Sequence, residues 1–370
     1  MGARRLRAAD RGRRRDGLLT LIATLTAPRA AHTTTARGSR SRAWVLGVGV
    51  LVCAGLLVLA AALSVAVGAK SVPLGQVWSA WLHPDGSYAS AIVASRLSRT
   101  TLGLLAGSAL AVAGAVIQGL TRNPLGDPGI LGVNAGASAS VVLVTATLGA
   151  GAGRSVWAAV PGALVAAVAG YVIAAGGPRG RATPVRLVLA GVAISAVLAA
   201  LVQAVALARP DVFSSYRFWV VGSLAGRPPD TVDRVLPFIV VGLALALLLP
   251  RGLNALALGD ETATALGLRT GRTQAVGAAS ATLLAAAAVA AVGPVGFVGL
   301  AVPHVVRSFT GPDHRWLLPY CALLGPVLLL ASDVLGRVVA RPGELMVGVV
   351  TAFVGAPFLI AVVRRGRAGL

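Results

Sequence analysis

The sequence predicts an all-α polytopic membrane protein with about ten transmembrane helices, and three observations predict it. Only 12% of the 370 residues are charged, whereas a soluble domain carries about 25%. Hydrophobic residues make up 56% of the chain and gather in long stretches with few charges. The 46 glycines suit the close helix packing found in lipid. A soluble helical domain would need polar stripes at helical spacing, and long parts of this chain lack them.

Residues 1–43 form a polar, arginine-rich segment, which we expect to be a disordered cytoplasmic tail. The run at 17–26 is too short to span a bilayer. With Arg13-Arg14-Arg15 before it and Ala30-Ala31 after it, this run imitates a cleavable export signal. The tail is favoured because a full spanning segment follows at once.

The membrane domain is predicted over residues 44–365, as a series of apolar stretches of which the eighth is short and broken. These stretches lie at about 43–67, 101–120, 130–150, 156–175, 183–207, 235–250, 273–292, 295–308, 316–332 and 345–363.

The arginines indicate the orientation. The net charge is +21, and basic residues concentrate at both ends of the chain. Because basic segments stay on the cytoplasmic side, the N- and C-termini are predicted to be cytoplasmic, and so is the loop 251–272. Predicted outer loops also carry arginines, so this orientation rests mainly on the termini. The sequence contains no basic patch interleaved with aromatic residues, so nucleic acid is not expected as a partner.

A broken segment lies at membrane depth, where Gly293, Pro294, Gly296 and Pro303 interrupt the apolar pattern. Non-helical backbone is tolerated there only where protein or a water-filled cavity shields it. This segment therefore favours a translocation path over a simple anchor or a non-transporting scaffold.

Several kinds of chemistry have no signal in the sequence. A phosphate-binding loop needs Gly-Lys-Ser/Thr, and the one lysine, Lys70, follows Ala69. The twelve acidic residues fall in loops, tails or the ends of predicted helices, which disfavours an ion-coupled secondary carrier. The histidines and cysteines form no metal-ligand spacing, and no Ser/His/Asp grouping suggests a hydrolase. Energy for transport must then come from a partner.

Nine blocks of sequence, in order, closely resemble the FecCD family of ABC permeases. The blocks are RLSRT at 96–100, GAVIQGLTRNPL at 114–125, GVNAGA at 132–137, LAGVAI at 189–194, WVVGSL at 219–224, LGDETATALG at 258–267, GFVGLAVPHVVR at 296–307, SDVLGR at 332–337 and GVVTAFVGAPF at 348–358.

The resemblance implies a type II ABC importer in the bacterial inner membrane, embedded in lipid. Such an importer has two ten-helix permease subunits, identical or paralogous, and an extracytoplasmic binding protein. Two cytoplasmic ATP-binding subunits use ATP and Mg, so this chain itself would bind no cofactor. The family imports ferric siderophores, cobalamin or haem, and a ferric siderophore is expected first.

The loop 251–272 contains a predicted short helix. Asp260 and Glu261, after Gly259, place two acids in its first turn, where they favour the positive end of the helix dipole. Gly267 is a plausible C-terminal stop after Ala265 and Leu266. The residues alone fit an ordinary capped surface helix equally well. The resemblance implies that this is the coupling helix, seated in a groove of the ATP-binding subunit.

The resemblance also gives a role to the predicted outer face. Arg96, Arg99 and Arg337 match family arginines that receive acidic residues of the binding protein, and a guanidinium pairs well with a carboxylate. Topological or lipid-headgroup contact is the alternative. Gln118 and Asn134, with the broken segment, are candidates for the path wall, although both amides suit hydrogen bonds between helices equally well.

Overall fold

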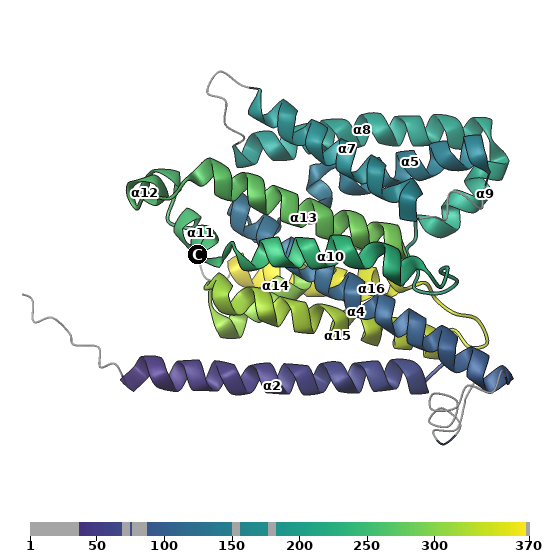
Figure 1. Cartoon of the computed structure of the whole chain (residues 1–370), viewed down its shortest axis with the longest axis horizontal. Helices are drawn as coiled ribbons and strands as arrows, with labels where there is room; N and C mark the ends of the chain where they lie inside the picture. The colour runs from purple at the N-terminus through teal and green to yellow at the C-terminus, as the bar shows by residue number, and fades with distance from the viewer. Residues whose placement is uncertain (1–36, 69–74, 76–86, 150–155, 177–182, 368–370) are drawn as a thin grey trace, which may run out of the picture. The chain divides into compact units, whose positions relative to one another are not determined.

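The computed structural model describes residues 37–68, 75, 87–149, 156–176 and 183–367, and among these residues it contains helices and no strand (Figure 1). The chain divides into two units, residues 1–47 and 48–370. The described part of the first unit is the start of helix α2. The second unit contains the rest of α2 and all later elements. Most of the predicted tail, residues 1–36, lies outside the described residues.

The helices follow one another in the order α2 (Arg37–Ala66), α4 (Tyr88–Thr121), the 3-10 helix η1 (Pro128–Leu131), α5 (Val133–Leu148), α7 (Val156–Ala175), α8 (Pro184–Ala208), α9 (Pro210–Trp219), α10 (Thr231–Leu247), α11 (Pro250–Leu256), α12 (Asp260–Ala265), α13 (Thr270–Val292), α14 (Val298–Thr310), α15 (His314–Val339) and α16 (Val347–Arg367).

Each of the ten predicted apolar stretches coincides with a helix. Six described helices, α2, α4, α7, α8, α13 and α15, are long and apolar enough to cross a membrane alone. Helices α10 and α11 make a seventh candidate span, bent by 56° between them. Helix α5 and the segment Val347–Ala361 of α16 are apolar but shorter, and α14 has 13 residues. The predicted stretch at 130–150 was longer than α5 because it included part of η1. The stretch at 295–308 began before α14 because it included part of the Gly/Pro break.

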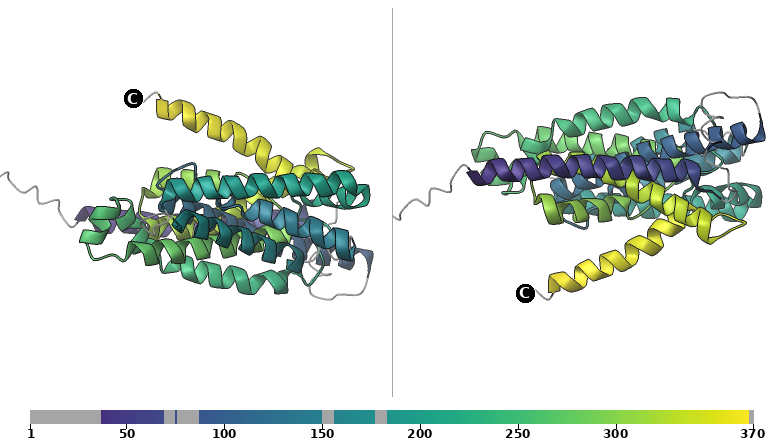
Figure 2. Two further views of the ribbon diagram at one scale, coloured as in Figure 1. Left: turned by 90° about the horizontal axis from the view of Figure 1, so that it is seen from above. Right: turned by 90° about the horizontal axis from the view of Figure 1, so that it is seen from below.

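Helices α4 and α13 form the centre of the second unit. Helix α4 packs against α10, α13, α14 and α15. At Gly114 the backbone of α4 touches Gly299 of α14 so closely that an added Cβ would collide with the Gly299 carbonyl oxygen. Small residues allow this approach, which lipid does not otherwise drive. Helix α16 contacts α14 and α15, then diverges from the bundle toward its C-terminal end (Figure 2).

Helix α4 begins well before its predicted start. It runs for 34 residues from Tyr88, and the Ser87 hydroxyl caps it by accepting from the Ser90 N–H. At 1.5 Å per residue it is about 51 Å long, which exceeds the ~30 Å hydrocarbon core of a bilayer. Arg96 and Arg99 therefore lie inside a helix, although the sequence placed them before it.

Helix α15 likewise extends beyond its predicted end, to Val339. Asp333 and Arg337 lie inside it, so the expectation that every acid falls in a loop, a tail or a helix end was wrong for Asp333. The stretch appeared to stop at 332 because two charged residues follow. In the structure these charges are paired and buried, which lets the helix continue.

The interruption after α13 is confirmed. Helix α13 ends at Val292, Gly293 adopts φ = +83°, and α14 begins at Val298. Pro294 and Gly296 lie in the non-helical segment, whereas Pro303 lies inside α14. The Ser223 N–H donates to the Val292 carbonyl at 2.7 Å, so a neighbouring loop satisfies an acceptor at the broken end.

Candidate functional site

The candidate sites lie at opposite ends of helix α4. Arg99 is in its first third, and Arg122 caps its C-terminal end. Arg122 lies 23 positions after Arg99, which corresponds to about 35 Å along the helix. Arg122 pairs with Asp260 of α12 at 3.4 Å, so α12 lies at the end far from Arg99. Figure 1 shows α12 and α9 at opposite ends of the bundle.

Helix α12 has the ends that its sequence predicts. It starts after Gly259, carries both acids in its first turn, and ends at Ala265. The Leu268 N–H donates to the Ala263 carbonyl and the Gly267 N–H to the Thr264 carbonyl, at 3.0 and 2.9 Å. This pair of bonds is a Schellman motif, which needs a left-handed residue after the helix, and Gly267 supplies it with φ = +81°.

One side of α12 is anchored and the other is exposed. Ala263 is fully buried, whereas Ala265 and Leu266 are exposed, and Leu266 exposes 68% of its surface. A large apolar side chain at the tip of a short helix, beyond the apolar spans, is suited to insertion into a pocket of another protein.

The base of α12 is tied to α15 through α11. The Asn254 amide donates to an Asp313 carboxylate oxygen at 2.6 Å, and its carbonyl oxygen accepts from the His314 N–H at 3.0 Å. These bonds join α11 to the start of α15.

At the other end of α4, Asp333 joins two arginines. Its carboxylate is fully buried, accepts from Nε and Nη2 of Arg99 at distances between 2.7 and 3.1 Å, and pairs with Nη2 of Arg337 at 3.0 Å. Arg99 also pairs through Nη1 with Glu344, at 2.7 Å. Burying a carboxylate is costly unless opposite charges and hydrogen bonds surround it, and here both do.

Three arginines cap the C-terminal end of α2. Arg337 Nη1 donates to the carbonyls of Ser64 and Val67, Arg96 Nη1 to those of Val65 and Ala66, and Arg341 Nη2 to that of Gly68, at distances from 2.8 to 3.1 Å. The last carbonyls of a helix lack intrahelical partners and carry the negative end of the dipole. We call this arrangement the arginine cap; it covers five consecutive carbonyls.

The arginine cap changes the interpretation of the predicted docking residues. Arg96 and Arg337 expose only 7% and 1% of their surfaces, and both point into the protein. A soluble partner therefore cannot touch Arg337 in this conformation. Arg99, with a side chain 12% exposed, reaches the surface at Nη1, where Glu344 contacts it. The structure thus brings the three arginines together but leaves one of them within a partner's reach.

The two predicted path amides have different surroundings. Gln118 is buried, donates to the Gly299 carbonyl at 3.2 Å and accepts from Arg307 Nη2 at 3.1 Å. It therefore makes hydrogen bonds between helices, the alternative that its sequence also allowed. Asn134, in the first turn of α5, is half-buried and lies beside Gly129 of η1, the short helix that Asp127 caps. Burial raises the pKa of the Asp127 carboxyl, an effect that the bond from the Gly129 N–H opposes.

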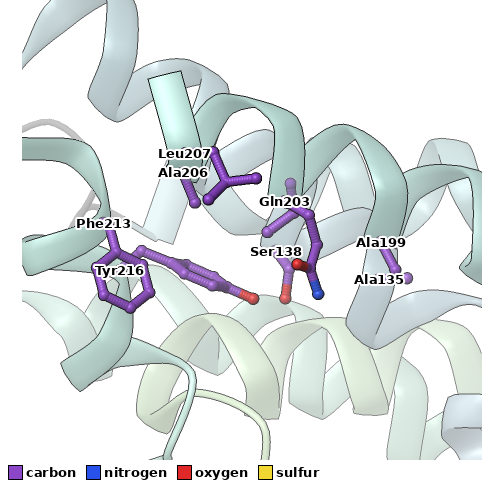
Figure 3. Close-up of a pocket in the computed structure, with 9 residues that line it drawn as sticks. Ala135, Ser138, Ala199, Gln203, Ala206, Leu207, Phe213 and Tyr216 are labelled. Atoms are coloured by element: carbon purple, nitrogen blue, oxygen red, sulfur yellow. The ribbon is translucent and has the colours of Figure 1, made fainter. Parts of the chain in front are cut away.

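A cavity of about 370 Å³ lies among α5, α8 and α9, and the sequence did not indicate it. Its walls are mostly apolar, but Ser138, Gln203 and Tyr216 direct their polar groups into it from three different helices (Figure 3). Within the described part of the chain none of these three side chains has a hydrogen-bond partner. Gln203 is exposed, so the cavity opens to the surface, and its three polar groups could accept or donate to a ligand with oxygen or nitrogen atoms.

Helix α9, which forms part of this cavity, was missed because it lies between two predicted apolar stretches, those at 183–207 and 235–250. Local signals for it do exist in the sequence. Pro210 stands at its first position, Asp211 in its first turn and Arg217 in its last turn. Each of these placements favours a helix.

A half-buried cation, Arg227, lies beside the break after α13. Arg227 Nε donates to the Ser223 carbonyl at 2.9 Å, and an added Cβ on Gly293 would meet Arg227 Nη2 at 3.4 Å. Burial lowers the pKa of Arg227 to about 10, so the guanidinium remains charged at neutral pH. Among the described residues no group of three His, Cys, Asp or Glu side chains could hold a metal ion.

Apolar spans, an interrupted helix and a protruding short helix define this molecule as a multi-pass membrane permease. Residues 56–365 match the model of the FecCD transport family, and the chain belongs to that family. It is 50% identical to the ferric enterobactin transport system permease protein FepD of Escherichia coli (strain K12), over 85% of this chain and 94% of the relative.

Two further comparisons agree. The chain is 38% identical to the Fe(3+)-citrate import system permease protein YfmD of Bacillus subtilis (strain 168), over 82% of this chain and 91% of that protein. A solved structure, described as an inward-facing conformation of a metal-chelate type ABC transporter, matches with a TM-score of 0.73 and 26% identity. It covers 85% of this chain and 98% of the solved one.

Proposed function

We propose that the chain is the permease subunit of an ATP-driven ABC importer in the bacterial inner membrane, and that its cargo is a ferric siderophore-type chelate. The 50% identity to a ferric enterobactin permease over nearly the whole relative carries this proposal. A cobalamin import permease of Halobacterium salinarum is 38% identical over 73% of this chain, which keeps cobalamin as a second candidate cargo.

The protruding helix α12 supports a partner that supplies the energy. Leu266 is positioned to enter a groove of an ATP-binding subunit, with Gly259, Asp260, Glu261, Ala265 and Gly267 shaping the helix that presents it. ATP and Mg would be bound by that subunit and by no site on this chain. A second permease subunit, identical or paralogous, would complete the assembly. The exposed face of α8, a helix whose apolar span is 22% buried, supports such packing.

At the opposite end we propose that an extracytoplasmic binding protein docks through carboxylates, with Arg99 as the accessible guanidinium and Arg96 and Arg337 holding the surface around it. The exposed ion pair between Arg99 Nη1 and Glu344 supports this assignment. The predicted orientation, with both termini cytoplasmic, places that end outside.

If the chain is part of an ATP-driven importer, uptake of the chelate requires ATP on the cytoplasmic side. The test uses sealed right-side-out vesicles that contain the complete importer. Accumulation of a ferric tris-catecholate in them is expected to require enclosed ATP and to persist when an uncoupler collapses the proton gradient. A secondary carrier would behave in the opposite way. Uptake that needs no ATP and stops with the uncoupler would contradict the proposal.

We further propose that the cavity among α5, α8 and α9 contributes to the wall of the cargo path, in place of Gln118, whose amide is already engaged. Asn134 and the segment of Gly293, Pro294 and Gly296, with Pro303 behind it, remain candidates for other parts of the wall.

Changing Gln203→Leu or Tyr216→Phe is expected to lower chelate uptake about five- to tenfold, because each removes a hydrogen bond worth roughly 1–1.5 kcal/mol. The ATP hydrolysis rate of the complex without cargo should stay the same. Val241→Leu, on an exposed part of α10 away from the cavity, is the matched control. Uptake that is equal in all four proteins would exclude the cavity from the path.

A further inference from the structure

Arg99 holds two carboxylates in unlike ways. Asp333 is fully buried and occupies Nε and Nη2, whereas Glu344 has a side chain 36% exposed and contacts Nη1 alone, at 2.7 Å. A bidentate pair is stronger and more directional than a single contact. An exposed single ion pair contributes little and is weakened by salt. The two acids therefore differ greatly in how easily they can be exchanged.

Glu344 also lies on a chain segment that could respond to its release. It stands between α15 and α16, and α16 begins three residues later, at Val347. The Leu345 N–H donates to the Gly336 carbonyl at 3.1 Å, and Gly348 N–H donates to the Gly222 carbonyl at 3.2 Å. Gly222 in turn lies against Gly293 and Pro294, where the path helix is broken. A shift at Glu344 would thus act close to the interrupted helix.

The charges at this end leave room for one more carboxylate contact. In the described part of the chain, four arginines (Arg96, Arg99, Arg337 and Arg341) gather around two acids, Asp333 and Glu344, so the cluster keeps an excess of positive charge. Arg96 and Arg337 donate to carbonyls at the end of α2, and Arg337 also pairs with Asp333. An acidic side chain that arrives from outside can therefore reach the guanidinium of Arg99. It would contact Nη1, the nitrogen that Glu344 now contacts.

We propose that Glu344 is a placeholder carboxylate: an acidic side chain of the docking partner replaces it on Nη1 of Arg99, while Asp333 keeps Nε and Nη2. This inference rests on the proposed docking function. It adds that docking is an exchange of ion-pair partners, which frees the segment between α15 and α16. Removing the Glu344 charge should then favour docking, although Glu344 lies inside the docking surface.

The test uses the full-length chain in phosphatidylcholine nanodiscs and a labelled peptide with three glutamates as the probe. A peptide with glutamines in those positions is the reference. We expect Glu344→Gln to bind the acidic peptide about two- to fivefold more tightly than the wild type at low salt, and the gain to shrink as salt rises. The basic tail is present in every variant, so its attraction for the peptide cancels in the comparison.

Asp230→Asn is the matched control. It removes the same charge from another exposed ion pair, between Asp230 and Arg234 at the start of α10. Equal tightening by both substitutions would show a general charge effect and overturn the exchange. So would unchanged or weaker binding by Glu344→Gln. A gain that appears only when the nanodiscs contain phosphatidylglycerol would assign Nη1 to lipid and also overturn it.

The experiment separates this inference from the docking function beneath it. If Arg99→Lys lowers peptide binding while Glu344→Gln has no effect, Arg99 docks acids but Glu344 is no placeholder. If neither substitution changes binding of the acidic peptide relative to the glutamine peptide, the docking role of Arg99 itself is wrong.

Discussion

Replacing Ala265 by Arg and Leu266 by Glu together is expected to abolish ATP-dependent uptake while the protein still inserts and folds. Both side chains are exposed at the tip of α12, so the change leaves the bundle core untouched. An apolar side chain seated in a partner's pocket typically contributes about 2 kcal/mol, and its loss weakens association roughly 30-fold. Placing charges there adds a desolvation cost.

The measurement compares co-purification of the ATP-binding subunit with chelate uptake. Leu125→Glu is a suitable control, because Leu125 is an exposed leucine in the turn after α4, at the same end of the bundle and outside the apolar stretches. Ala263 must stay unchanged because it is buried, and Gly267 because its left-handed backbone ends the helix. Normal uptake by the double variant would show that α12 is an ordinary surface helix.

The helices were predictable because their signals are local. An apolar stretch of sufficient length identifies a span without knowledge of its neighbours, and each predicted stretch is helical. The same holds for α12, where two acids and a following glycine mark the ends within nine residues. Local chemistry also revealed the break at Gly293 and Pro294.

The ends of α4 and α15 could not be predicted in this way. Charged residues normally mark the edge of a span, so the pattern placed Arg99 and Asp333 outside. Their partners are each other, 234 residues apart in sequence. Nothing local indicates that these charges neutralise each other in the fold, and a single sequence without the fold cannot supply that pairing.

The arginine cap escaped prediction for a related reason. A side chain that caps a helix usually comes from a neighbouring position, whereas Arg337 reaches Ser64 across 273 residues. The family resemblance suggested docking roles for Arg96 and Arg337, and the structure adds that both donate hydrogen bonds to the end of α2. The cavity among α5, α8 and α9 was equally hidden, because Ser138, Gln203 and Tyr216 lie near one another only in three dimensions.

Asp333→Ala is expected to cause the largest loss of stability, about 3–5 kcal/mol in the free energy of unfolding. The substitution leaves Arg99 and Arg337 buried with no carboxylate between them, and the two guanidinium groups would repel each other. Arg337 also caps α2, so its displacement would expose the Ser64 and Val67 carbonyls. The measurement is thermal and denaturant unfolding of the purified protein in detergent.

Asp230→Ala provides the comparison, because its ion pair with Arg234 is exposed on both sides and should contribute at most about 1 kcal/mol. Asp333→Asn should fall between the two, since its amide oxygen can still accept from Arg99 although the negative charge is lost. If Asp333→Ala were no less stable than Asp230→Ala, the buried carboxylate would not be what holds the arginines in place. The end of α2 would then have to be fixed by apolar packing alone.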